Sequence, residues 1–206
     1  MASNTPATEL PLFPLQAVLF PGGLLSLKVF ETRYVDLVTA SLREQRPFGV
    51  VALRAGREAR RVEDGQHFET IGTVAELLDV DSERSGILQV RCRGTQRFVV
   101  ERGRQQADGL WLGETRSVPN DALLAPTPAL AEAVRGLASA IASLKGRGSE
   151  PFLTPHRFDD AGWVANRWCE ILPISAIAKQ KLMELPDPIV RLQLVDDFLR
   201  SRGVVK

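Results

Sequence analysis

The order of apolar and polar residues predicts two strands joined by a tight turn at the start of the chain. Leu10–Leu19 is apolar but carries Pro11 and Pro14, and proline cannot donate a hydrogen bond to a neighbouring strand. We therefore expect an edge strand or an extended entry there. The segment Phe20–Gly23 is typical of a turn, because its proline fixes φ and its glycines permit positive φ. Apolar residues alternate with polar ones over Leu24–Phe30, which predicts a second strand.

From Glu31 the apolar residues recur at a spacing of three or four, which predicts a helix that ends at about Arg43. Its expected buried face consists of Tyr34, Leu37, Val38 and Leu42. The apolar run Val50–Leu53 then predicts a short buried strand. Residues 54–66 are nearly all charged or small, and we expect them to form a solvated loop.

A series of short apolar segments separated by turn residues predicts an antiparallel meander. The expected strands are Ile71–Val80, Ile87–Arg93, Arg97–Arg102 and Leu110–Val118. Turns are expected at residues 81–86 and at Gly94–Gln96, and a polar loop at residues 103–109. Such a meander argues for a sheet or a partial barrel.

After residue 118 the spacing of apolar residues is helical. The expected helices cover about residues 128–144, 159–172, 175–185 and 187–200, with Thr127, Ser175 and Asp187 as N-caps. The sequence thus predicts an α+β chain in three parts. These are a β-rich subdomain at residues 1–118, a linker at residues 119–127 and a helical subdomain at residues 128–206.

Three linked motifs stand in the first 42 residues. They are Pro-Leu-Phe-Pro-Leu at Pro11–Leu15, Val-Leu-Phe-Pro-Gly at Val18–Gly22 and Phe-Glu-x-Arg-Tyr at Phe30–Tyr34. In this order they resemble the start of the Lon protease N-terminal (substrate-binding) domain. The resemblance continues through Gly72–Val74, Arg91, Gly94, Arg97 and Phe98, and through Leu172–Ser175, Lys179–Leu182, Arg191 and Leu192. The resemblance covers about residues 10–199. It implies a stand-alone form of the domain, without the ATPase and protease modules of full-length Lon proteases.

This resemblance implies a PUA-like, mostly antiparallel β pseudo-barrel with one helix, followed by a helical subdomain. It also implies non-catalytic recognition of unfolded or extended polypeptide, as an adaptor or regulator of proteolysis with a protease as partner. The candidate polypeptide-binding or family-motif residues are Phe13, Pro14, Phe20, Pro21, Gly22, Phe30, Glu31, Arg33, Tyr34 and Arg97. Each also has a structural interpretation, as turn, core or helix-start residue.

Two physical routes to polypeptide binding are open at this stage. One is an apolar groove between the β subdomain and the helices, and the other is an open sheet edge that pairs with an extended peptide. Leu10–Leu19 is the candidate edge, and an exposed apolar patch near Phe13, Leu15 and Phe20 would support it.

RNA binding is the alternative function, because some PUA-like domains bind RNA. An arginine-bearing sheet face with Arg91, Arg93 and Arg97 would contact phosphates. However, the chain has 26 basic and 25 acidic residues and a net charge of +1, which argues against a nucleic-acid partner. Glu101 and Glu114 are also available to pair with these arginines.

The composition suits a soluble cytoplasmic protein without a cofactor. A chain of 206 residues can bury a core large enough to need no disulfide or metal. Its two cysteines, Cys92 and Cys169, favour a reducing compartment. The first ten residues lack the features of a signal peptide, and prolines interrupt the apolar run that follows, so we expect no membrane span.

Motifs for catalysis are absent from the sequence. There is no Gly-x-x-x-x-Gly-Lys-Ser/Thr phosphate loop and no Gly-x-Ser-x-Gly nucleophile elbow. Ser175 and Lys179 have the spacing of a Ser–Lys pair, but an N-cap role explains Ser175 better. A zinc site would need His67, His156, Cys92 and Cys169, none of which forms a short-spaced ligand pair. We therefore expect neither enzyme activity nor a bound metal.

Overall fold

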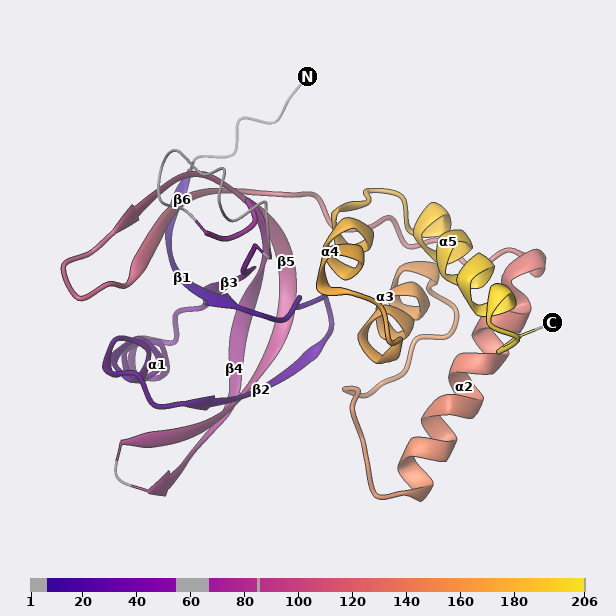
Figure 1. The fold of residues 1–206 in the computed structure, drawn as a ribbon, viewed down its shortest axis with the longest axis horizontal. Helices are drawn as coiled ribbons and strands as arrows, with labels where there is room; N and C mark the ends of the chain where they lie inside the picture. The colour runs from indigo at the N-terminus through magenta and orange to yellow at the C-terminus, as the bar shows by residue number, and fades with distance from the viewer. Residues whose placement is uncertain (1–6, 55–66, 85, 206) are drawn as a thin grey trace. The chain divides into compact units, whose positions relative to one another are not determined.

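The structure is a computed structural model that describes residues 7–54, 67–84 and 86–205. The chain divides into two compact units, Met1–Pro119 and Asn120–Lys206. The first unit holds the sheet and one helix, and the second is helical (Figure 1). Apart from Arg54, the loop expected at residues 54–66 lies outside the described residues.

A six-stranded mixed sheet forms the first unit. Its strands are β1 (Thr8–Leu15), β2 (Leu24–Val29), β3 (Phe48–Ala52), β4 (Ile71–Arg84), β5 (Ile87–Gln105) and β6 (Trp111–Ser117), with α1 (Thr32–Glu44) between β2 and β3. The order across the sheet is β2-β5-β4-β3-β1-β6, and β6 also pairs with β5. β1 and β3 are parallel, and the other pairs are antiparallel. This near-barrel with one helix confirms the predicted fold class.

The length of β5 closes the ring. Residues 87–99 of β5 pair with β4, so β4 occupies one edge of this strand. The opposite edge is shared by β2, which pairs with residues 88–93, and by β6, which pairs with residues 98–105. β2 therefore lies outside the closed ring of five strands, and in the described part of the chain it pairs with β5 alone.

The prediction that the proline-bearing strand is an edge is wrong, because β1 has a neighbour on each side. Residues 8–12 pair with β6, and residues 12–15 pair with β3. The two partners divide the strand between them, so Pro11 lies in the part paired with β6 alone and Pro14 in the part paired with β3 alone. Each proline thus has one side without a ladder partner, where a missing N–H is tolerated.

The turn expected at Gly94–Gln96 is also wrong, because β5 continues through it. Gly94 instead marks the place where the turn after β1 crosses the strand. Its N–H donates to the carbonyl of Gly23, and its carbonyl accepts from the N–H of Gly22. A Cβ at Gly94 would lie 2.3 Å from the carbonyl oxygen of Phe20, so a side chain does not fit.

The expected turn at Phe20–Gly23 is confirmed. Gly23 N–H donates to the Phe20 carbonyl at 2.9 Å, and Gly22 has a φ of 74°. Helix α1 is confirmed too, and it buries Tyr34, Leu37, Val38 and Ser41. Leu42, which was expected on that face, is 57% exposed. The buried face of α1 packs on Phe13, Val29, Phe48 and Val90 in a hydrophobic core cluster of the β unit.

The helical unit contains a 3₁₀ turn and four α-helices. These are η2 (Pro128–Leu130), α2 (Ala131–Gly146), α3 (Ala161–Ile171), α4 (Ala176–Glu184) and α5 (Pro188–Ser201). The expected caps Ser175 and Asp187 are confirmed, because their side chains accept backbone N–H bonds at the starts of α4 and α5. Thr127 only precedes the 3₁₀ turn, and its side chain makes no capping bond.

Helix α3 is the centre of this unit. Every residue from Ala161 to Cys169 is buried, and Asp160 caps the helix by accepting from the N–H groups of Gly162 and Trp163. Trp168 donates its indole N–H to the carbonyl of Ala133 on α2 at 2.9 Å. Helices α2 and α5 both contact α3, so the helical core forms around it.

Candidate functional site

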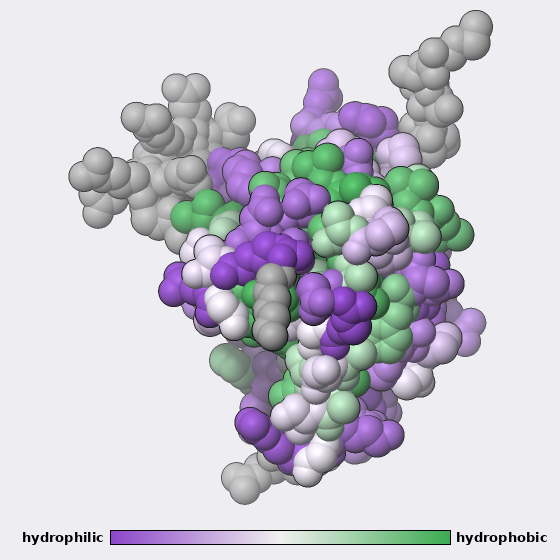
Figure 2. All heavy atoms as spheres, turned by 90° about the vertical axis from the view of Figure 1, so that its right-hand side faces the viewer, coloured by the Kyte–Doolittle hydropathy of each residue, from purple (hydrophilic) through white to green (hydrophobic). Residues whose placement is uncertain are grey.

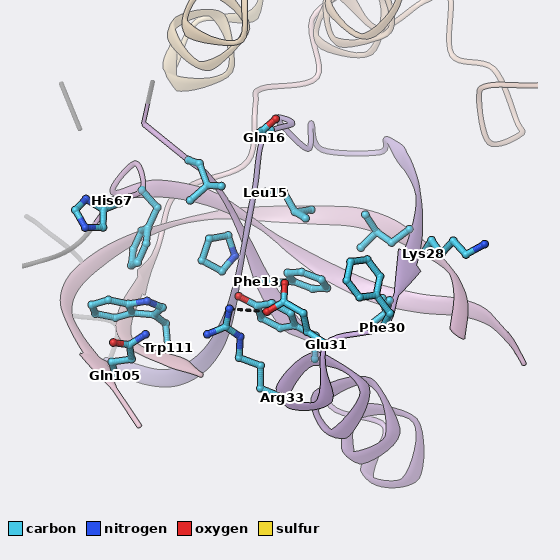
Figure 3. Close-up of a pocket in the computed structure, with 16 residues that line it drawn as sticks. Phe13, Leu15, Gln16, Lys28, Phe30, Glu31, Arg33, His67, Gln105 and Trp111 are labelled. Atoms are coloured by element: carbon cyan, nitrogen blue, oxygen red, sulfur yellow. Dashed lines mark hydrogen bonds and ion pairs between the residues drawn. The ribbon is translucent and has the colours of Figure 1, made fainter. Parts of the chain in front are cut away.

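A cavity of about 430 Å³ lies in the β unit (Figure 3). It is lined by Phe13, Pro14, Leu15, Gln16, Leu27, Lys28, Val29, Phe30, Glu31, Arg33, Tyr34, Leu53, His67, Phe68, Gln105 and Trp111. The end of β1, the end of β2 and the start of α1 supply most of these residues. Chain order explains the convergence, because β2 runs directly into Phe30, Glu31 and α1.

Aromatic rings form much of the cavity wall. The rings of Phe13 and Tyr34 stack with their centroids 4.0 Å apart and their planes 12° from parallel. Phe68 and Trp111 meet edge-to-face at 5.2 Å. Phe30, which sequence reasoning allowed as a core residue, is 67% exposed. A large aromatic side chain in water beside an aromatic cavity is available for a ligand to cover.

Arg33 fixes the polar side of the cavity. Its guanidinium lies 4.8 Å from the centroid of the Tyr34 ring and pairs with the Glu31 carboxylate at 2.6 Å (Figure 3). It also donates to the carbonyl of Gly109 at 3.1 Å, and Gln105 donates to the same oxygen at 3.0 Å. These contacts hold the arginine in one orientation against the aromatic wall.

The ionisation of Tyr34 follows from its position. Burial raises the pKa of its phenol above the ordinary value of 10.0, and the neighbouring Arg33 opposes that rise. The tyrosine is therefore neutral at physiological pH. Among the described lining residues, Lys28 and Arg33 are the cations and Glu31 is the anion, and Arg33 pairs with Glu31.

Six of the ten predicted site residues lie together at this cavity. They are Phe13, Pro14, Phe30, Glu31, Arg33 and Tyr34. Sequence reasoning missed lining residues from other elements, above all Phe68, Gln105 and Trp111. No local pattern marks them, because the closure of the sheet alone brings them to the cavity.

The remaining four predicted residues have other environments. Phe20 is fully buried, and Pro21 and Gly22 belong to the turn that crosses β5. Arg97 is 3% exposed and donates to the carbonyl of Pro119. An exposed apolar patch near Phe13, Leu15 and Phe20 would have supported peptide pairing at Leu10–Leu19, but both phenylalanines are buried, whereas Phe30 is exposed.

The structure disfavours the arginine-bearing face considered for the alternative function, RNA binding, because it buries Arg97. Arg97 points into the protein, so it cannot extend a stripe from Arg91 and Arg93. Arg93 pairs with Glu76 at 2.7 Å, and Arg116 pairs with Glu101 at 2.8 Å. These ion pairs neutralise the sheet face rather than leave it basic.

Ser175 and Lys179 have structural roles, and the two cysteines are buried. Ser175 Oγ accepts from the N–H of Ala178 at 3.1 Å, while Lys179 Nζ donates to the carbonyl of Glu170 at 2.9 Å. Burial raises the pKa of the Cys92 and Cys169 thiols to about 12, which disfavours the thiolate that zinc requires. In the residues that the structure describes, no three metal-ligating side chains form a cluster.

Other exposed apolar residues are more scattered. In the helical unit they include Leu123, Ile177, Val190 and Leu194. On the face drawn in Figure 2, hydrophobic and hydrophilic residues are intermixed. Over the described residues, none of the helices has the length and apolar character needed to cross a membrane.

The near-barrel, its single helix and the four following helices define the class of protein. The model of the ATP-dependent protease La (LON) substrate-binding domain matches residues 9–201, and the chain belongs to this family. A solved structure of a Lon N-terminal domain protein from Xanthomonas campestris is similar to it, with a TM-score of 0.70 and 34% identity over 91% of this chain and 96% of that one. The N-terminal domain of a Mycobacterium avium complex Lon protease shares the fold, with a TM-score of 0.63 and 19% identity over 92% and 97% of the two chains.

Longer proteins are also similar to this chain. A Lon protease of Paraburkholderia phytofirmans is 30% identical over 97% of this chain and 25% of its own length. The protein cereblon of Xenopus tropicalis is 33% identical over 59% of this chain and 26% of its own length. The chain thus spans about a quarter of the length of these curated relatives.

Proposed function

We propose that this chain recognises unfolded or extended polypeptide without catalysing a reaction, and that the aromatic cavity of the β unit is the binding site. The observation that carries this proposal is the meeting of six family-motif residues at one cavity, where one of them, Phe30, exposes its ring. The family to which the chain belongs is described as a substrate-binding domain, which supports the same function.

The chemistry of the wall suits apolar side chains of a flexible ligand. A cavity of about 430 Å³ is within the usual range for ligand sites, and it admits side chains rather than a folded surface. Burying one large apolar side chain contributes roughly 1.5–3 kcal/mol. A few such contacts stabilise the complex, but the entropy lost on ordering the ligand chain reduces the binding free energy. We therefore expect dissociation constants on the order of micromolar.

Polar contacts at the cavity support binding rather than chemistry. Arg33 is held by Glu31 and Gly109, and none of the described lining residues is a serine or a cysteine. We infer that a bound segment is held and released unchanged. Such a module would serve proteolysis by presenting substrates, either beside a protease partner or as part of a longer chain.

Fluorescence anisotropy tests this function. A labelled, permanently unfolded polypeptide is titrated with the protein, and a labelled single-stranded RNA of similar length is the comparator. We expect saturable binding to the polypeptide alone. Salt-sensitive binding to the RNA alone, or binding to neither, would overturn the proposal.

A pair of variants ties the binding to the cavity. Phe30→Ala removes the exposed ring at the cavity, and we expect it to weaken polypeptide binding about tenfold. Leu78→Ala removes an apolar side chain of the same unit that is 44% exposed and does not line the cavity. It should bind as tightly as the unchanged protein, and equal losses in the two variants would place the site elsewhere.

A further inference from the structure

We propose that the polypeptide binds as an added strand along the open edge of β2, with alternate apolar side chains entering the cavity. This inference rests on the proposed function and names its binding mode. The proposed edge is that of β2 and not that of β1, because β1 pairs with both β3 and β6. Among the described residues, β2 pairs with β5 alone.

The open edge faces the cavity. β2 and β6 share one edge of β5, and the strand beyond β6 is β1. Pairing of β1 with β6 ends at Leu12, so residues 13–15 of β1 pair with β3 alone in the described chain. Residues 13–16 and 27–30 line the same cavity, so the two incompletely paired edges border it together.

The occupant that fits the open edge of β2 is an extended backbone. An unpaired strand edge presents alternating N–H and C=O groups along its length, and another strand satisfies them in register. A helix cannot do so, because its own backbone groups are bonded internally. The six residues of β2 offer an edge long enough for a short peptide segment.

The direction of the β2 side chains predicts the pattern of the ligand. Leu25, Leu27 and Val29 point toward the core cluster that contains Phe13 and Tyr34. Side chains of an added strand alternate in the same way, so every second residue would point to the cavity side. Apolar residues at alternate positions should therefore bind better than the same residues at helical spacing. The proposed occupant is thus an extended segment with apolar residues at alternate positions.

Competition against the labelled unfolded polypeptide tests this mode with isomeric peptides. One peptide has apolar residues at alternate positions, and the other has the same composition with apolar residues three or four apart. We expect the alternating peptide to compete at least about tenfold better than its isomer.

Backbone methylation separates strand pairing from simple cavity filling. Two versions of the alternating peptide carry N-methyl groups on either the odd or the even residues. In an added strand only one set of N–H groups faces β2, so one version should lose binding about tenfold or more while the other retains it. Equal behaviour of the two versions would overturn strand addition.

The outcomes also separate this proposal from the function on which it rests. If all peptides compete alike, the strand mode is wrong and polypeptide recognition stands. If neither the unfolded polypeptide nor any peptide binds, both are wrong. If the protein sediments as a dimer that the peptides do not dissociate, β2 of a second copy is the occupant and the proposal is overturned.

Discussion

The ring of Phe13 on β1 stacks against the ring of Tyr34 on α1, with 4.0 Å between the centroids. This contact joins the strand to the helix and forms part of the cavity wall at the same time. Fold and binding site therefore share residues in this part of the chain.

Phe13 and Phe30 belong to the same group of motifs but should behave in opposite ways. Phe13 is 6% exposed, so Phe13→Ala leaves a cavity in the core and should lower the free energy of unfolding by about 3–5 kcal/mol. Phe30 is 67% exposed, so Phe30→Ala should change it by less than about 0.5 kcal/mol. Urea unfolding measures both, and equal effects would contradict the assignment of structural and binding roles.

Local signals in the sequence were sufficient to predict an α+β chain with a sheet and a helical part, while the PUA-like pseudo-barrel was implied by the family resemblance. Period-two alternation, the Phe20–Gly23 turn and the caps Ser175 and Asp187 each lie within a few residues. The motif at Phe30–Tyr34 also led to four of the residues that line the cavity, since β2 and α1 are adjacent in the chain. Trp111 and Gln105 could not be predicted, because only the closure of β6 onto β5 brings them to the site.

Wrong predictions arose where distant segments decide the local structure. Gly94 was interpreted as a turn residue, yet it is a strand residue over which another segment passes. Pro11 and Pro14 were interpreted as marks of an edge, yet two partners share that strand. In each case the residue type was informative, but the sequence did not reveal the neighbour that required it.

Gly94 gives a direct test of that crossing. Gly94→Ala would place a Cβ 2.3 Å from the Phe20 carbonyl oxygen, so the turn must move. We expect the free energy of unfolding to fall by about 1–3 kcal/mol. The control is Gly146→Ala at the end of α2, where an added Cβ meets nothing within 4 Å. It should be neutral or slightly stabilising, and a harmless Gly94→Ala would contradict the close approach.

A buried ion pair should stabilise the helical unit. Arg191, which is 1% exposed, donates to both carboxylate oxygens of Asp121 at 2.5 and 3.2 Å and also to Asn166. Asp121→Asn removes the negative charge and leaves a buried guanidinium without its counter-ion. We expect the free energy of unfolding to fall by about 3–5 kcal/mol in thermal or urea unfolding.

An exposed ion pair provides the matched control for that variant. Glu132 and Arg135 lie on α2 with 42% and 65% of their side chains exposed. Glu132→Gln should change the free energy of unfolding by less than about 1 kcal/mol, because water screens the pair. If the two substitutions destabilise the protein alike, burial does not make the loss of the Arg191–Asp121 ion pair more costly than the loss of an exposed pair.

Glu170, at the end of α3, should make the stability of the protein vary with pH. Its carboxylate accepts from Arg167 Nε at 2.8 Å and Nη2 at 2.6 Å, and its carbonyl accepts from Lys179. Burial raises the pKa of the Glu170 carboxyl from 4.5 to about 7, against the opposing effects of Arg167 and Lys179. Between these values the folded state binds more protons than the unfolded state. The contribution of the Glu170 carboxyl to stability is therefore present at low pH and is lost as pH rises from about 4.5 to 7.

Glu170→Gln should remove that contribution to the slope. We expect the free energy of unfolding of the unchanged protein, relative to the variant, to fall by roughly 1–3 kcal/mol between the ends of this pH window. Urea unfolding at several pH values measures the slope, and the carbon chemical shift of the Glu170 carboxyl gives its titration midpoint directly. A midpoint near the ordinary value for glutamate, with parallel slopes for the two proteins, would mean that the Arg167 ion pair outweighs the effect of burial.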